Sequence, residues 1–189
     1  MLKFFTEALG YFLEDRLSVL PEKPVVSFAL PGQVPGRNAV NLFFSALAED
    51  GELRSNEMQY ERAAHGWIAH KPPLSLKCTY IVSIWPALDD PQEAALTQIK
   101  LLGEAYSLFA LNQTLPDVYL PAPMKTSGLP KPVIALQKDD LWTRPEFWTS
   151  AGCLFRTAFS FCATIHLPVV EEHYEHIVEG VRLDYHGSR

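Results

Sequence analysis

The sequence predicts an α+β fold in which a mixed β-sheet is flanked by helices. Residues 74–85 alternate apolar and polar side chains, which predicts one long strand with an apolar face, and Pro72 and Pro73 precede them. A diproline cannot sit inside a strand ladder, so it fixes where this strand begins. A stripe of apolar residues at helical spacing follows between residues 94 and 109. Extended and helical stretches of this kind, mixed along one chain, are typical of α+β domains.

The predicted elements follow from the local periodicity. Apolar residues at spacings of three and four, from Phe4 to Leu17, predict an amphipathic helix that ends before Pro21. The next extended run stops at Pro31, and the one after it places apolar residues on one face. That face is expected to hold Val40, Leu42, Phe44 and Ala46. The elements predicted in this first half are a helix over 4–17, strands over 25–30 and 39–48, and a turn over 49–52.

Residues 53–71 have little periodicity and carry several polar and charged side chains, so they predict a hairpin arm or a mobile loop. After the strand over 74–85, Asp89-Asp90-Pro91 supplies an N-cap followed by a proline early in the first helical turn. Five prolines between residues 112 and 132 predict an irregular surface connection. The remaining predicted elements are a strand over 133–136, a helix over 139–150 and a strand over 154–167 that ends at Pro168.

Composition predicts one compact domain. The chain has 189 residues, of which 48% are hydrophobic, and we expect a single α+β domain over residues 1–168 with a C-terminal extension over 169–189. The net charge of −6 gives no electrostatic reason to bind nucleic acid. No apolar run is long enough for direct membrane insertion. The three cysteines lie in apolar runs and predict buried thiols rather than a disulfide framework.

Few side chains are candidates for a metal site or a catalytic site. His173 and His176 share a face only if their segment is helical, and no third ligand is evident, so a solvated tail is favoured over a metal site. Cys162 and His166 lie four apart in a predicted strand, roughly 13 Å from each other, which is too far for proton transfer. Asp139 and Asp140 predict helix capping. We therefore expect no catalytic residue, no metal and no cofactor, and a protein that is not an enzyme.

Several motifs together resemble a known family. Val40-Asn41-Leu42-Phe43-Phe44, Leu53-Arg54, the diproline with its long strand, Leu101-Leu102-Gly103-Glu104-Ala105 and Leu141-Trp142 occur in an order that is similar to the cap family of contractile injection systems, which are phage-tail-like particles. The resemblance covers roughly residues 25–167 and extends to the tail terminators of contractile phages. It implies a hexameric ring that closes the distal end of the inner tube and anchors the last layer of sheath. It also implies assembly in the cytoplasm, within a particle that is either released or membrane-anchored.

The expected partner-binding residues form two groups. Arg54, Tyr60 and Trp67 lie in the predicted arm, which we expect to dock on the tube end. Val181, Leu183 and Tyr185 alternate with polar residues and predict a short C-terminal strand that joins a sheath subunit. Paired aromatics such as Phe43 and Phe44 cannot both face one core, so one of each pair is expected at a contact surface.

Two other functions remain open. One is a tail-completion adaptor of a related contractile tail, with a similar architecture and a different docking face. The other is a small-molecule-binding enzyme, which would need a concave site with converging ionisable groups. No such group of residues is evident in the sequence.

Overall fold

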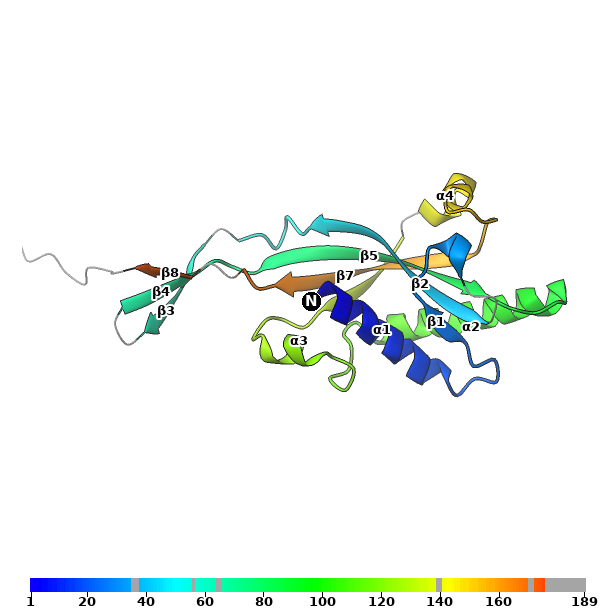
Figure 1. The fold of residues 1–189 in the computed structure, drawn as a ribbon, viewed down its shortest axis with the longest axis horizontal. Helices are drawn as coiled ribbons and strands as arrows, with labels where there is room; N and C mark the ends of the chain where they lie inside the picture. The colour runs from blue at the N-terminus through cyan, green and yellow to red at the C-terminus, as the bar shows by residue number, and fades with distance from the viewer. Residues whose placement is uncertain (35–37, 56, 64–65, 139–140, 170–171, 176–189) are drawn as a thin grey trace, which may run out of the picture.

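The computed structural model describes residues 1–34, 38–55, 57–63, 66–138, 141–169 and 172–175. Figure 1 shows an elongated molecule with helices on both faces of a long sheet and a smaller sheet projecting from one end. The elements in chain order are α1 (Leu2–Leu17), β1 (Val25–Ser27), η1 (Pro31–Gln33), β2 (Ala39–Glu49), β3 (Gln59–Ala63), β4 (Gly66–His70), β5 (Leu74–Trp85), α2 (Pro91–Leu111), α3 (Ala122–Thr126), β6 (Val133–Gln137), η2 (Leu141–Thr143), α4 (Pro145–Ser150), β7 (Ala158–Leu167) and β8 (Glu172–Glu175).

The main sheet is mixed and has the strand order β1-β2-β5-β7-β6. β1 runs parallel to β2, and the other neighbours are antiparallel. β5, the strand predicted after the diproline, lies at the centre and pairs along almost its whole length with β2 and β7. The predicted α+β fold with a mixed, helix-flanked sheet is confirmed.

The core lies between this sheet and the helices α1 and α2. Phe109 of α2 stacks on Phe161 of β7 with ring centroids 4.3 Å apart, and Phe161 stacks in turn on Tyr80 of β5 at 5.1 Å. Phe12 of α1 meets Phe109 edge to face. Burying each aromatic side chain of this kind stabilises the fold by about 1.5–3 kcal/mol. The helices predicted from the apolar stripes over 4–17 and 94–109 are confirmed as α1 and α2. Asp90 caps α2 by accepting a hydrogen bond of 2.8 Å from the Glu93 amide.

The opposite face of the sheet is covered at one end by η1 and α4. Trp148 of α4 is fully buried, and its indole Nε1 donates a 2.6 Å hydrogen bond to the carbonyl of Trp142. The prediction of one continuous helix over 139–150 is wrong. A 3-10 turn ends at Thr143, and α4 begins separately at Pro145, whose ring favours the first position of a new helix. Asp139 and Asp140 lie outside the described residues.

β2 departs from simple alternation. A β-bulge between Phe44 and Ala46 changes which side chains face the helices. Val40 and Leu42 are buried on that face as predicted, but Ala46 is not part of it. Leu47 faces the helix side instead, because it lies opposite Cys78, whose side chain is in the core. The Leu47 side chain is half exposed there.

Three further boundaries differ from the prediction. β1 is shorter than expected because the Ser27 hydroxyl accepts a hydrogen bond from the Ala29 amide and turns the chain toward η1. β7 begins at Ala158 rather than at 154, opposite Ser83 near the end of its partner β5. The irregular connection over 112–132 contains the short helix α3.

The second sheet has the strand order β3-β4-β8, and we call it the arm. Residues 53–71 thus contain a hairpin, one of the two structures predicted there. Its third strand was not predicted. Residues 172–175 pair with β4 as a strand. The expectation of a solvated tail at His173 stays a prediction, and His176 lies outside the described residues. The arm projects from the end of the main sheet where β5 begins (Figure 1).

Candidate functional site

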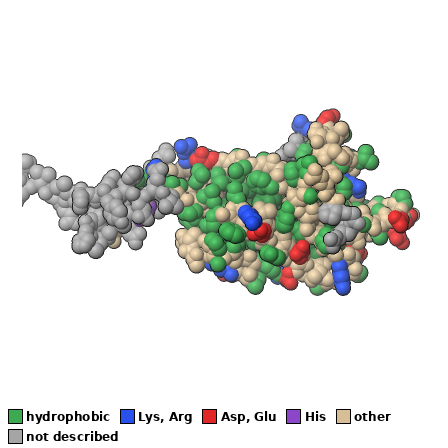
Figure 2. All heavy atoms as spheres, viewed as in Figure 1, with side chains coloured by type: hydrophobic (Ala, Val, Ile, Leu, Met, Phe, Trp, Pro, Cys, Tyr) green, Lys and Arg blue, Asp and Glu red, His purple; other side chains and the backbone are tan. Residues whose placement is uncertain are grey.

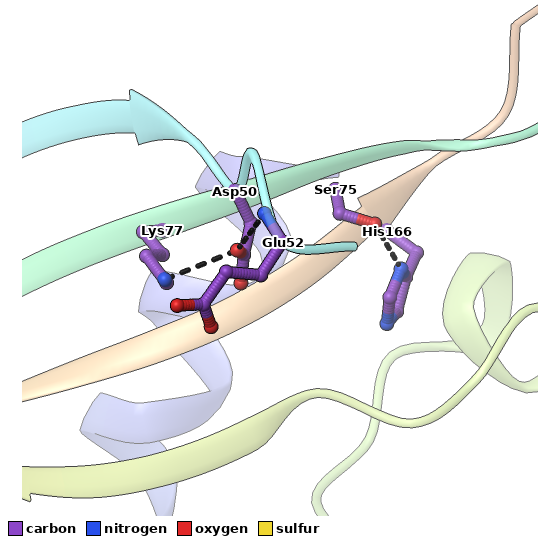
Figure 3. Close-up of polar contacts among 5 residues, drawn as sticks. All are labelled: Asp50, Glu52, Ser75, Lys77 and His166. Atoms are coloured by element: carbon purple, nitrogen blue, oxygen red, sulfur yellow. Dashed lines mark hydrogen bonds and ion pairs between the residues drawn. The ribbon is translucent and has the colours of Figure 1, made fainter. Parts of the chain in front are cut away.

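The end of the main sheet next to the arm carries a small polar cluster (Figure 3). Asp50, which directly follows β2, is buried and accepts hydrogen bonds from the Lys77 ammonium at 3.0 Å and from the Glu52 amide at 3.2 Å. The hydrogen bond from Lys77 lowers the pKa of the Asp50 carboxyl, and the same contact raises the pKa of Lys77. This ion pair ties the turn after β2 to the central strand. Its role is structural.

A serine and a histidine lie beside that pair. The Ser75 hydroxyl and His166 Nδ1 are 2.9 Å apart across the β5–β7 ladder (Figure 3). A serine nucleophile would need an exposed hydroxyl and a carboxylate that orients the imidazole. Ser75 is buried, and the Asp50 carboxylate is engaged by Lys77 and a backbone amide. The pair fits a cross-strand hydrogen bond better than a catalytic centre.

The thiols are also poorly suited to catalysis. Cys78, Cys153 and Cys162 are free, and Cys78 and Cys162 are buried, as predicted. Burial raises the pKa of Cys78 to about 11 and also raises the pKa of Cys153 and of Cys162. Among the described residues, no group of three or more His, Cys, Asp or Glu side chains could hold a metal ion. Within the same part of the chain, no helix is long and apolar enough to cross a membrane.

The base of the arm forms a shallow pocket. Arg54 Nε lies 3.5 Å from Glu49 Oε1 across the turn after β2, and both side chains are largely exposed. An exposed ion pair of this kind contributes little to stability, so the guanidinium remains available to a partner. The pocket has a volume of about 240 Å³ and is lined by Arg54 and Glu49 together with Ser55, Met58, Lys71, Pro72, Pro73, Leu74, Ser75 and Val169.

The structure brings together only some of the predicted partner-binding residues. Tyr60 lies on β3 and is half exposed, and Trp67 lies on β4 opposite Arg62. Both therefore belong to the arm, with Arg54 at its base. The other predicted group, Val181, Leu183 and Tyr185, lies outside the described residues.

An apolar groove on the other side of β2 was not predicted. It has a volume of about 360 Å³ and is lined by Leu2, Lys3, Thr6 and Glu7 of α1, by Phe28 after β1 and by Phe44 of β2. Phe28 and Phe44 are 45% and 39% exposed, which is high for phenylalanine. Figure 2 shows hydrophobic side chains gathered on the face where α1 lies. The Phe43-Phe44 pair signalled one exposed aromatic, but nothing in the sequence placed α1 beside it.

A projecting arm and an apolar groove are surface features that suit contacts with other chains. The sequence model of the family described as the Pvc16 N-terminal domain matches residues 5–171. The chain belongs to this family. Comparison with curated proteins found no match.

Two solved structures share the fold. The sheath/tube terminator of PVC, an extracellular contractile injection system, in its extended state, aligns with a TM-score of 0.70 and 19% identity over 100% of this chain. The tube-terminating cap of the anti-feeding prophage aligns with a TM-score of 0.70 and 17% identity over 96% of this chain. The chain spans 64% and 60% of the lengths of these two proteins. The predicted resemblance to the cap family is confirmed.

Proposed function

We propose that this chain is a structural terminator of a contractile injection system and not an enzyme. In this role it forms a ring that closes the distal end of the inner tube and anchors the last layer of sheath. The observation that carries the proposal is the family match over residues 5–171. Support comes from the similarity of the whole described fold to a protein named as a sheath/tube terminator.

A terminator must stop the growth of a tube that is built from stacked rings. A tube of stacked rings grows through a top-to-bottom contact that does not close on itself, so each added ring offers a new site for the next. Growth stops only when a component binds the terminal face and presents no copy of that face. A terminator therefore needs one surface for the tube, one for its neighbours in the ring and one for the sheath.

We assign the arm to the tube. Tyr60 and Trp67 belong to it and Arg54 lies at its base, and it projects beyond the main sheet, where it can reach a neighbouring ring without disturbing the core (Figure 1). Aromatic and arginine side chains are enriched where protein interfaces bind most strongly. The ring is a homo-hexamer, the symmetry that the cap family implies.

The C-terminal segment is assigned to partner binding through Val181, Leu183 and Tyr185. An alternating segment of this kind adds a strand to an exposed sheet edge, where backbone hydrogen bonds supply affinity and every second side chain supplies register. Assembly takes place in the cytoplasm, within a particle that is afterwards released or membrane-anchored. The net charge of −6 disfavours nucleic acid as a partner.

Elongation of the purified tube protein of the same particle tests the proposal. With this chain present, tubes should be shorter and carry added density at one end, and Arg54→Ala with Tyr60→Ser should restore long tubes. Lys131→Ala is the matched control, since Lys131 pairs with Asp117 at an exposed site far along the chain from the arm. Tubes of unchanged length at saturating concentrations of the chain would contradict the proposal.

A further inference from the structure

β2 has an open edge. Its one neighbour on the side away from β5 is β1, which pairs only with Ala39, Val40 and Asn41. Residues 42–49 of β2 therefore have no strand on that side among the described elements. Unpaired edges of this length are templates for another strand, and proteins usually shield them.

The apolar groove lies directly against this edge. β1 ends at Ser27, Phe28 follows, and the groove opens between Phe28, Phe44 and the first two turns of α1. Thr6 lines this groove, and its hydroxyl forms a 2.8 Å hydrogen bond with the Tyr80 hydroxyl that fixes α1 against the sheet. Leu47, half exposed, continues the apolar surface along the same face of β2. A helix wall beside an open strand edge is an arrangement that suits strand addition.

Such a site selects an extended segment with apolar residues at every second position. The open edge offers main-chain donors and acceptors, and the groove takes alternate side chains on the helix side. This chain carries a segment of that chemistry, because Val181, Leu183 and Tyr185 alternate with Arg182 and Asp184.

The last described strand, β8, ends away from the groove of its own chain (Figure 1). β8 begins at Glu172, opposite His70, at the base of the arm. It ends at Glu175, opposite Trp67, close to the hairpin turn. The last described residue therefore lies at the outer end of the arm, which points away from α1 and β2 (Figure 1). A neighbouring molecule is the more accessible acceptor.

We propose that residues 181–185 of one copy add as a strand to residues 42–49 of β2 in the next copy, with apolar side chains in the groove between α1 and β2. The donor and the acceptor are different surfaces, so each copy gives one strand and receives one, and rotation can close the chain of contacts into a ring. The inference rests on the proposed ring. It assigns the C-terminal segment to ring closure instead of the sheath contact expected from the sequence.

Cross-linking between two variants of the full-length chain tests this contact. One variant carries Leu47→Cys and the other Leu183→Cys, both with Cys153→Ser because Cys153 is the described cysteine that is not buried. Leu47 is 50% exposed, so a cysteine there leaves the core intact. A short bismaleimide should join the mixed variants into covalent dimers. Leu96→Cys, on the exposed face of α2, replaces Leu47→Cys in the matched control and should give none.

Two added changes test the mode of binding. Val181→Asp with Tyr185→Asp should lower the dimer yield at least about tenfold, because a charge placed in an apolar groove is costly to bury. Arg182→Ala with Asp184→Ala, on the other face of the segment, should leave the yield unchanged. Dimers confined to mixed variants support the proposal. Products that form equally well from either variant alone, or no product in either free chains or assembled particles, would overturn it. Particles that remain capped without any cross-link would overturn this contact alone and leave the terminator function standing.

Discussion

Asp50 is a single residue that organises the end of β2. Its carboxylate accepts hydrogen bonds from the Glu52 amide and from Lys77, so it closes the turn and joins it to β5. The turn lies between the main sheet and the arm, where Arg54 begins the predicted tube contact. A buried carboxylate in this place is a structural link between the core and the surface that we assign to a partner.

Asp50→Asn should make stability depend less on pH. The native pKa of Asp50 is lowered, so its contribution is present above the unfolded carboxyl pKa of about 3.9 and is lost as the pH falls through the native value. The pKa of Lys77 is raised, so its contribution is lost as the pH rises through that value. The difference in unfolding free energy between native and variant proteins should therefore be largest near neutral pH and shrink in acid and in strong base.

Urea unfolding across this pH range measures the difference, with Glu57→Gln as the control for loss of an exposed carboxylate. The amide of asparagine retains an acceptor for the Glu52 amide, which isolates the ion pair from the turn. A difference that stays constant from acid to neutral pH would show that the ion pair is not responsible.

Gly32→Ala should detach η1 from α4. The Gly32 amide donates a 3.1 Å hydrogen bond to the carbonyl of Ala151, and an added Cβ would overlap that same oxygen. Backbone cannot move aside as a side chain can, so we expect a loss of about 1–3 kcal/mol. Gly51→Ala is the control because nothing lies near its Cβ position, and it should change stability by less than about 0.5 kcal/mol. Equal urea midpoints for the two variants would contradict this packing.

At the scale of elements, sequence patterns predicted what local chemistry determines. The alternation of β5, the apolar stripe of α1 and the cap of α2 at Asp90 all depend on neighbours in sequence. The bulge in β2 was not predictable from that information, because Ala46 fits the alternation and only pairing with β5 moves Leu47 to its place. β8 was missed for a related reason, since the ladder with which it pairs is supplied by β4, which is distant in sequence. The apolar groove likewise depends on three elements that are distant in sequence.

The arm should be separable from the main domain. β3, β4 and β8 pair only with one another in the described chain, and the arm projects away from the main sheet (Figure 1), so we expect that residues 56–70 can be removed without opening the core. Joining Ser55 to Lys71 should keep the near-ultraviolet signal of the buried Trp148 and change the melting temperature by less than about 4 °C, which corresponds to about 1 kcal/mol for a chain of this size.

The deletion should also abolish shortening of tubes in the elongation assay, because it removes Tyr60 and Trp67. Tyr60→Ser alone, which keeps the arm, should weaken the shortening of tubes less than the deletion does. Loss of the near-ultraviolet signal after deletion would show instead that the arm supports the core.

At the scale of the whole molecule, the surfaces are arranged for assembly in more than one direction. The arm extends the long axis of the molecule, while α1 and β2, which line the apolar groove, lie along its body (Figure 1). Contacts of the first kind can stack rings, and contacts of the second kind can close one ring. The proposed terminator needs contacts of both kinds as well as a surface for the sheath. Such contacts would cover apolar side chains that are exposed in the single chain.

Electron microscopy of particles assembled with and without this chain tests the central claim most directly. Particles that contain it should have a uniform tube length and a closed density at the distal end. Particles that lack it should show open tubes of variable length with a disordered last layer of sheath, and adding the chain back should restore the closed end. Uniform, closed particles assembled in its absence would contradict a terminator function.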